Sequence, residues 1–424
     1  MVYVLSKDGK PLMPCSNVIA RLLLKQGKAK VRKRQPFTVK LNYETTNYTQ
    51  NLTLGVDTGS GTFGTAVTRD NGEIVYLSEV TVRNDITDKM TQRAMYRRNR
   101  RSRKTRYRKA RFLNRRNSIR EGRFSPTMQS KLHSHVKEIE WIRSILPVRT
   151  MVFEAGQFDT HLMKNPAFAD PKTRLWGYQK GPNYGYANTK AMVLNRDGYT
   201  CQYCHGKRKN SRLEVHHIQY RHMGGSDDSD NLITLCRSCH KDVHDGKITL
   251  PNVGKKKGTL KYATQMNSIR KQLSLAYPEA AETYGYVTKE NAQLLGIEKR
   301  HCLDACVIAT QGQPFTVKSL LYRKKCIPKG DFQQTKGVRS EQPVATGKIG
   351  GFQKFDKVRY LGKEYFIKGR MSSGYAILMD FEGKKADFSH MPRGQKTPKL
   401  SRMQRLETRS SWMTTAEAGI QNTA

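Results

Sequence analysis

The segment CQYCHGKRKNSRLEVHHIQYRHMGGSDDSDNLITLCRSCHKDVH, residues 201–244, contains four cysteines in two C-x-x-C pairs. Cys201 and Cys204 form the first pair, and Cys236 and Cys239 form the second. Two such pairs suit one tetrahedral zinc ion, because each turn supplies two thiolate ligands at a fixed spacing. The segment therefore predicts a small module held together by zinc, although the cysteines alone would predict only a structural ribbon.

Three histidines add chemistry that a structural ribbon does not need. The pattern LEVHHI predicts a strand, so His216 and His217 face opposite sides of it, and His240 directly follows the last cysteine. One of the paired histidines could bind a hard divalent ion together with His240, which leaves the other to accept a proton from water. Phosphodiester cleavage requires this combination of a metal ion and a neutral base, so the segment favours a nuclease.

The residue order Cys-x-x-Cys, His-His-Ile, Gly-Gly, Asn-Leu and Cys-x-x-Cys-His resembles that of the HNH (ββα-metal) endonucleases. The resemblance implies that His217 is the general base and that His216 and His240 bind a catalytic Mg²⁺ ion. It also implies that Asn231 holds the loop and orients His217. His244 is a candidate helper to which the sequence assigns no role.

The chain as a whole is strongly basic. Its 424 residues include 77 Lys and Arg against 35 Asp and Glu, a formal net charge of +42. This excess predicts a polyanionic partner, most commonly nucleic acid, with a membrane surface as the weaker alternative.

The sequence also indicates a compartment. No apolar run approaches the ~20 residues of a membrane-spanning helix, and the N-terminus MVYVLSKDGKPLMP lacks the apolar stretch of a signal peptide. We therefore expect a cytoplasmic protein, in which paired cysteines bind metal rather than form disulfides. The remaining thiols, Cys15, Cys302, Cys306 and Cys326, are expected to be inert core residues.

A basic run occupies residues 91–116, with 13 Lys and Arg among 26 residues and neither Gly nor Pro. As a helix, its charges would point all round the axis and repel one another unless phosphates approach from more than one side. We predict a helix buried against nucleic acid, with a solvated basic helix or a disordered basic tail as alternatives. The predicted nucleic-acid-binding residues are Arg97, Arg98, Arg100, Arg101, Arg103, Lys104, Arg106, Arg108, Lys109 and Arg111.

Acidic residues outside the cysteine module lie at the ends of predicted elements. Asp57 ends the apolar strand LTLGVD, and Glu154 ends another in RTMVFEA. His301 and Asp304 are three residues apart in the predicted helix KRHCLDACVIATQ, so they share a face. Carboxylates from two strand ends and a helix suit a nuclease with two Mg²⁺ ions, which prefer hard oxygen ligands. Taken singly, each residue is explained as a turn-former or as a polar surface residue.

Gly59, Gly61 and Gly64 formally match a dinucleotide-binding fingerprint after the first of these strands. That fingerprint needs a helix next, whereas TFGTAVTRDNGEIVYLSEVTV predicts a β-hairpin with its turn at residues 70–72. We therefore reject a dinucleotide site.

The segments VDTGSGTFG, VFEAGQFD and KRHCLDA resemble the three separated motifs of a RuvC-type nuclease of the RNase H fold. With the opening GKPLMP, the basic run and the HNH-like module, their order resembles that of the IscB proteins, which are transposon-linked RNA-guided DNA nucleases of prokaryotes. The resemblance implies that Asp57, Glu154 and Asp304 bind Mg²⁺ and that His301 orients or activates the attacking water. Residues 155–156, Ala-Gly, depart from the larger residue and Asn that family members often carry there.

The predicted fold class is α/β, with an RNase H-like (RuvC) split domain, an inserted zinc-stapled ββα-metal HNH domain, an arginine-rich bridge helix and a β-rich C-terminal nucleic-acid-binding domain. The predicted units are an N-terminal PLMP-type domain at 1–49, RuvC-like parts at 50–90, 118–159 and 263–315, the bridge helix at 91–117, linkers at 160–190 and 251–262, the HNH domain at 191–250, and a region for RNA and a target-adjacent motif at 316–424. We also predict a turn at GKPLMP, a strand near TYGYVT, barrel-like strands within 358–383 and a poorly ordered tail after about residue 392.

The resemblance implies an RNA-guided DNA endonuclease. A structured guide RNA would bind the basic helix and the C-terminal region, the HNH site would cut the guide-paired strand, and the RuvC-like site would cut the displaced strand of double-stranded DNA. We expect Mg²⁺ at both sites, structural Zn²⁺ in the HNH module, and a monomeric protein associated with the nucleoid when on DNA, with no membrane partner. Two alternatives remain, a stand-alone HNH homing or restriction-like DNA endonuclease and a non-catalytic zinc-containing RNA-binding protein.

Overall fold

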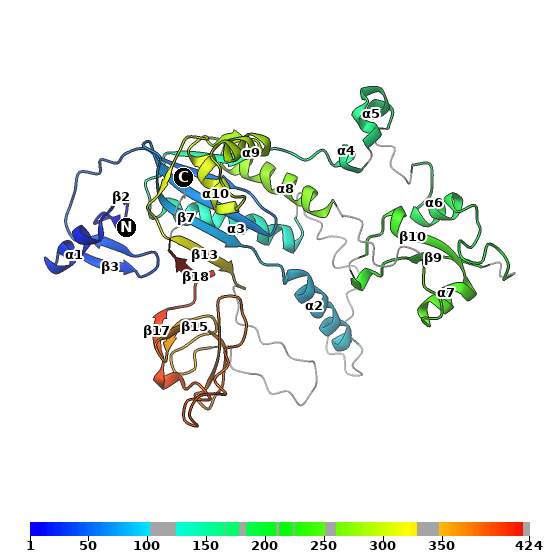
Figure 1. Ribbon diagram of the computed structural model, residues 1–424. Helices are drawn as coiled ribbons and strands as arrows, with labels where there is room; N and C mark the ends of the chain where they lie inside the picture. Colours follow the sequence, from blue (N-terminus) through cyan, green and yellow to red (C-terminus); the bar gives the residue numbers. More distant parts are fainter. Residues whose placement is uncertain are drawn as a thin grey trace. The chain divides into compact units, whose positions relative to one another are not determined.

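The computed structural model describes residues 1–101, 124–164, 166–177, 184–208, 212–223, 225–250, 260–328 and 347–418 (Figure 1). The chain divides into two compact units. Unit 1 comprises Met1–Gln157 and Gln265–Ala424, and unit 2, Phe158–Thr264, is inserted between these segments. Both units combine helices with strands, which confirms the predicted α/β class. Within the described ranges, no helix has both the length and the apolar character needed to cross a bilayer.

Unit 1 is built on a mixed eight-stranded sheet in the order β11-β8-β5-β6-β7-β13-β18, with β12 also paired to β7. Strands β5, β6 and β7 are antiparallel neighbours, so the predicted hairpin is present as β6 and β7. Strand β8 runs parallel to β5, and β11 runs parallel to β8. The bounds are β5 Leu52–Asp57, β6 Thr62–Arg69, β7 Glu73–Thr81, β8 Thr150–Glu154, β11 Ala281–Thr283, β12 Thr316–Val317, β13 Leu321–Cys326 and β18 Trp412–Glu417.

Helices cover both faces of this sheet. Leu54 and Val56 of β5 point to one face, where they pack in a cluster with apolar residues of α3 and α8. Ala66 of β6 packs on the opposite face with α9 and α10. Because side chains alternate along a strand, Asp57 points to the face that α10 covers. The bounds are α3 Pro126–Arg143, α8 Lys261–Ala276, α9 Gly285–Leu294 and α10 His301–Ala309.

Two glycines let α10 lie directly on the sheet. A β-carbon at Gly55 of β5 would lie 2.4 Å from the carbonyl oxygen of Ala305. A β-carbon at Gly64 of β6 would lie 1.9 Å from the carbonyl oxygen of His301. Both distances are far shorter than van der Waals contact, so a larger residue at either position would force the helix away. The two neighbouring strands therefore have no side chains at the positions directly beneath the helix.

The N-terminal part of unit 1 is a four-stranded sheet in the order β2-β1-β4-β3, packed against helix α1. The predicted turn at GKPLMP is wrong in part, because the turn spans residues 6–10 and the following residues form strand β2, antiparallel to β1. Pro11 and Pro14 are tolerated because β2 is an edge strand, where a missing N–H donor costs little. The bounds are β1 Val2–Leu5, β2 Pro11–Cys15, α1 Asn17–Lys25, β3 Ala29–Lys33 and β4 Thr38–Leu41.

The C-terminal part contains the predicted barrel-like strands as a four-stranded sheet in the order β16-β15-β14-β17. The predicted poorly ordered tail after residue 392 is wrong, because this segment contains β17 and β18. Strand β18 pairs antiparallel with β13 and buries Trp412 and Met413, so the tail extends the main sheet. The bounds are β14 Lys357–Tyr360, β15 Lys363–Arg370, β16 Ala376–Met379, the 3-10 helix η5 Leu400–Arg402 and β17 Gln404–Glu407.

The bounds predicted for the basic helix and for the strand near TYGYVT need correction, and part of the basic helix lies outside the described residues. Helix α2 spans Ile86–Arg101, so the predicted basic helix begins earlier, and its remaining residues lie outside the described ranges. The residues so affected are Arg103, Lys104, Arg106, Arg108, Lys109 and Arg111. The strand predicted near TYGYVT is shorter, because β11 ends at Thr283 opposite the last residue of its partner β8, and α9 begins at Gly285.

Unit 2 centres on the antiparallel pair β9 and β10, followed by helix α7 in a ββα order. The predicted linker at 160–190 is not irregular throughout, since it contains short helices. Prolines begin two of them, and proline suits a first helical turn because no backbone N–H is needed there. The bounds are α4 Thr160–Lys164, η2 Pro166–Ala169, α5 Pro171–Gly177, α6 Thr189–Arg196, β9 Leu213–His217, η3 Arg221–Met223, η4 Ser229–Asn231, β10 Leu232–Cys236 and α7 Arg237–His244.

We expect Gly64→Ala to destabilise unit 1 by roughly 1–3 kcal/mol, because the added methyl group must displace α10. Gly61→Ala is the matched control, since no described atom lies within 4 Å of a β-carbon there. The free energy of unfolding, measured by urea titration, checks the prediction. Equal stability of the two variants would contradict the close contact between helix and sheet.

Candidate functional site

Four buried cysteines of unit 2 converge. Cys236 ends β10 and caps α7, Cys239 lies in the first turn of α7, and Cys201 and Cys204 lie in the turn before β9. Their sulfur atoms all lie within 4.8 Å of one another, and Leu235 packs against them. This set fits a tetrahedral zinc ion, because two C-x-x-C turns present four thiols to one point.

A second converging group consists of His216 on β9 with His240 and His244 on α7. One ring nitrogen of each lies within 4.8 Å of the others, and the ring centroid of His216 is 4.9 Å from that of His240. The buried Nε2 of His216 has no hydrogen-bond partner among the described residues. Burial lowers the pKa of His216 to about 4, so its ring stays neutral. A neutral, otherwise unpartnered imidazole nitrogen fits a metal ligand, since leaving it unsatisfied costs roughly 1–3 kcal/mol.

The histidine to which the sequence assigned no role, His244, belongs to this group. It follows His240 by four residues on α7, which places both rings on one helix face. Tyr220 stacks on the ring of His244, with centroids 5.7 Å apart. The spacing of His240 and His244 is a signal that the sequence offers. Only the register of β9 against β10, however, shows that His216 meets them.

His217 points to the other face of β9. Its Nε2 lies 2.8 Å from Oδ1 of Asp227, and Nη2 of Arg221 lies 2.7 Å from the same oxygen. His217 lines a hollow of about 570 Å³ together with His240, Lys190 and Arg221. The carboxylate orients the imidazole, and the cations suit a phosphate group. The structure therefore places a candidate base and a candidate metal ligand at one hollow.

Asn231 fixes the loop that follows His217. Its Oδ1 accepts a hydrogen bond from the backbone N–H of Gln219 at 2.9 Å. Its Nδ2 donates to the carbonyl oxygens of Gln219 at 3.0 Å and Ser226 at 2.8 Å. A β-carbon at Gly225 would lie 1.8 Å from the carbonyl oxygen of Gln219, so glycine is required for this close approach. These bonds hold the loop in one conformation at the end of β9.

Unit 1 contains a separate polar site, called here the carboxylate site, formed by Asp57, Glu154, His301 and Asp304. Asp57 and Glu154 end the neighbouring parallel strands β5 and β8, and the other two lie in the first turn of α10. Nδ1 of His301 lies 2.6 Å from Oδ2 of Asp57. Burial, followed by the charge of Asp57, raises the pKa of Asp304 to about 6. Burial also raises the pKa of Asp57, and the charge of Glu154 adds to that rise.

Arg270 of α8 is a site residue that the sequence did not reveal. Its guanidinium donates to the carboxylate of Glu154 and to the carbonyl oxygen of Gly156, and its Nε donates to Oγ1 of Thr58 at 3.0 Å. Arg270 is only 5% exposed. An arginine in an amphipathic helix gives no sequence signal for such a contact, because its partners lie in distant segments of the chain.

The carboxylates are less tightly gathered than the cysteines and histidines. Among the described residues, the groups of three or more His, Cys, Asp or Glu with ligand atoms within 4.8 Å of one another are the four cysteines and the three histidines. Asp57 instead turns to His301 and Glu154 turns to Arg270. Mutual repulsion between carboxylates explains why each finds such a partner. The chemistry of the donors, hard oxygens, still fits Mg²⁺.

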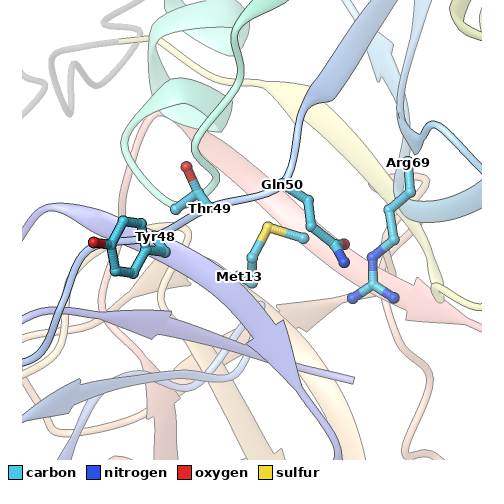
Figure 2. A pocket seen from close by; sticks show the side chains of 5 residues that line it. All are labelled: Met13, Tyr48, Thr49, Gln50 and Arg69. Atoms are coloured by element: carbon cyan, nitrogen blue, oxygen red, sulfur yellow. The ribbon is translucent and has the colours of Figure 1, made fainter.

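Another hollow, of about 440 Å³, is lined by residues of β2, β6 and the segment before β5. Figure 2 shows Met13 and Gln50 between Tyr48 and Arg69, and Thr49 completes the lining. None of these five side chains is a carboxylate, imidazole or thiol that could move a proton or bind a metal ion. The histidine group and the carboxylate site, rather than this hollow, hold the candidate catalytic groups.

Two protein families match this chain. The RRXRR protein family matches residues 2–181, which include RRNRR at 97–101, and the HNH endonuclease family matches residues 201–246. The chain therefore carries an HNH endonuclease domain after an RRXRR region, an order that is consistent with the IscB-type architecture. The HNH match confirms the predicted enzyme class, a DNA endonuclease.

Two curated proteins are similar to parts of this chain. Anaredoxin of Nostoc sp. (strain PCC 7120 / SAG 25.82 / UTEX 2576) is 36% identical over 72 residues, which are 17% of this chain and 91% of that protein. The type IV methyl-directed restriction enzyme EcoKMcrA of Escherichia coli (strain K12) is 37% identical over 65 residues, which are 14% of this chain and 23% of that enzyme. The likeness to the restriction enzyme therefore covers less than a quarter of its length.

We expect Cys239→Ser to abolish zinc binding by this endonuclease and to unfold unit 2, because structural zinc contributes roughly 10–16 kcal/mol of folding free energy. Zinc content by atomic absorption and proteolysis of the 158–264 segment measure the two effects. Cys15→Ser, which removes a thiol outside the cluster, should leave one zinc ion per chain. Unchanged zinc content in the Cys239 variant would overturn the assignment.

Proposed function

We propose that this chain is an RNA-guided DNA endonuclease in which the HNH site cuts the guide-paired strand and the carboxylate site cuts the displaced strand. The observation that carries the proposal is the presence of two separate constellations in one strongly basic chain. One is the histidine group with His217 in unit 2, and the other is the carboxylate site in unit 1. A single cutting site would leave the second constellation without a purpose.

At the HNH site, His217 acts as the general base. With Nε2–H donated to Asp227, its Nδ1 is the nitrogen that accepts the proton of the attacking water. Asp227 holds the ring and stabilises the imidazolium that results. Lys190 and Arg221, which line the same hollow, bind the phosphate. Asn231 keeps the loop after the base fixed.

The histidine group would hold one divalent ion through His216, His240 and His244, and the carboxylate site would hold Mg²⁺ through Asp57, Glu154 and Asp304. Such ions, when bound, polarise the scissile phosphate and stabilise charge on the attacking and leaving oxygens. Including His244 extends the ligand pair inferred from the sequence.

We also propose that the core of unit 1 is RNase H-like. The support is that three separated motifs converge on one sheet, with Asp57 and Glu154 at the ends of adjacent parallel strands and α10 across them. Within this site His301 donates Nδ1–H to Asp57, which leaves Nε2 to orient or activate the water. Arg270 is a positioning residue that keeps Glu154 at the strand end.

A guide RNA is the proposed polyanionic partner. The net charge of +42 supports it, and so does a groove of about 710 Å³ in unit 1. The cations that line this groove come from the N-terminal sheet, α3 and the C-terminal segment, and Trp141 and Trp412 lie among them. Positive charges beside aromatic faces suit an RNA strand, because they bind phosphates and stack on bases. The groove cations are Arg32, Lys33, Arg34, Lys137 and Arg405, whereas Lys324, which also lines the groove, is buried and paired with Glu138.

A second candidate function is a stand-alone HNH nuclease that acts without RNA. The match to the restriction enzyme EcoKMcrA favours it, since that protein shares the similarity over 65 residues. This alternative assigns no task to the carboxylate site.

We expect His217→Ala to lower cutting of the guide-paired strand by about 100-fold or more, because general-base catalysis contributes roughly 10²–10⁴-fold. Cutting of the displaced strand should persist. Asp57→Asn should give the opposite result, and strand-specific end labels on a target duplex measure both. Loss of both cuts from either single substitution would refute two independent sites.

The guided part of the proposal is tested by removing the RNA. The purified chain should carry RNA of defined length, and nuclease treatment followed by repurification should abolish cutting of a plasmid that contains the matching target. Adding the RNA back should restore cutting. An RNA-free chain that cuts the plasmid as fast as the complex would instead establish the stand-alone nuclease.

A further inference from the structure

Two exposed tyrosines stack on each other where β11 leads into α9. Tyr284 is 50% exposed to solvent, and Tyr286 is 65% exposed. Their ring centroids are 6.0 Å apart, and the ring planes are inclined by only 17°. Because both rings remain exposed to solvent, the pair is not part of the hydrophobic core. They are good candidates for a ligand with flat faces.

The pair lies beside the carboxylate site. Thr283, the residue before Tyr284, pairs in register with Glu154. A β-carbon at Gly285, between the two tyrosines, would lie 2.8 Å from Oε1 of Glu154, and one at Gly156 would lie 3.5 Å from Cδ1 of Tyr284. The ring of Tyr284 therefore lies beside the chain just after Glu154, a proposed metal ligand. Glycine at 285 is what allows the carboxylate to come so close.

We propose that Tyr284 and Tyr286 form a platform on which bases of single-stranded DNA stack while the phosphate backbone enters the carboxylate site. This inference rests on the proposed function, because it supplies the substrate contact for cutting of the displaced strand.

Physical chemistry favours a single strand over a duplex on this platform. In a duplex each base already has neighbours on both faces, whereas the bases of a displaced strand have free faces. Stacking on an aromatic ring is tolerant of sequence, because every base has a π-face. That tolerance is what a site must have when the guide alone selects the target.

The charges around the platform fit the same ligand. Lys299 lies close enough to Asp304 for its charge to oppose the rise in the pKa of that carboxyl. Arg270 of α8, a buried residue, pairs with Glu154 and reduces the negative charge at the end of β8. A phosphodiester backbone approaching the site therefore meets the charge of Lys299 as well as carboxylates, and the chain's net charge of +42 attracts the polyanion from a distance.

The test uses the full RNA-bound complex and a fluorescein-labelled oligothymidine as the probe. Tyr284→Ala/Tyr286→Ala should weaken binding of the probe by about tenfold or more, since stacking contributes roughly 1–3 kcal/mol per base. It should raise KM for displaced-strand cutting and leave guide-paired-strand cutting unchanged. Tyr284→Phe/Tyr286→Phe should retain the parent affinity, because phenylalanine keeps the flat face.

Tyr43→Ala/Tyr48→Ala is the matched control, since these tyrosines are 41% and 89% exposed but lie in the segment before β5. It should bind the probe like the parent chain. The single variant Tyr286→Ala, at the more exposed ring, replaces the double variant if thermal melting shows that the latter is unfolded.

Three outcomes would overturn the platform: parental affinity in the alanine variant, equal loss in the phenylalanine variant, or loss confined to an RNA oligonucleotide. The separate variant Asp57→Asn distinguishes failure of the proposed function from failure of the platform. If that variant still cuts the displaced strand, the carboxylate site is not the nuclease, whatever the tyrosines bind. If it loses the cut while the alanine variant binds and cuts normally, only the platform is wrong.

Discussion

The close contact of α10 with β5 and β6 is the constraint on which the carboxylate site depends. Helices normally pack on sheets through a layer of side chains, but Gly55 and Gly64 remove that layer and let backbone meet backbone. The first turn of α10 therefore reaches the end of β5, where His301 can hydrogen-bond Asp57 at 2.6 Å. If either glycine carried a side chain, the helix would stand off and its two polar residues would no longer face the strand ends.

Burial shifts the pKa values of the candidate ligands in opposite directions at the two sites. In unit 2, burial lowers the pKa of His216 to about 4, which keeps the imidazole neutral and its nitrogen available. In unit 1, burial raises the pKa of Asp304 to about 6, and the negative charge of Asp57 adds to that rise. A neutral nitrogen ligand needs no counter-charge, whereas clustered carboxylates do. This difference explains why the histidines converge closely while Asp57 and Glu154 each turn to a nitrogen donor.

Residues whose role follows from local pattern were predictable from the sequence. The cysteine spacing predicted a cluster that the structure brings within 4.8 Å, and Asp57 and Glu154 were placed at strand ends by the apolar runs before them. Contacts that depend on distant segments were not predictable. Arg270 meets Glu154 from 116 residues away, and β18 joins the main sheet through β13 although the residues before it, 393–409, are basic and polar. Such pairings are set by tertiary packing, which a single sequence does not display.

The contact of Arg270 with Glu154 also explains how the chain can leave unit 1 just after a proposed metal ligand without disturbing it. Unit 1 is interrupted just after Gly156 and resumes in α8, the helix that carries Arg270. Arg270 donates both to the carbonyl oxygen of Gly156 and to the side chain of Glu154, so it joins the departing chain to the returning one. The end of β8 is thereby held in place by contacts that lie within unit 1. The position of Glu154 is then fixed by the sheet and by one buried arginine, and the sequence and length of the inserted segment are free to serve a second site.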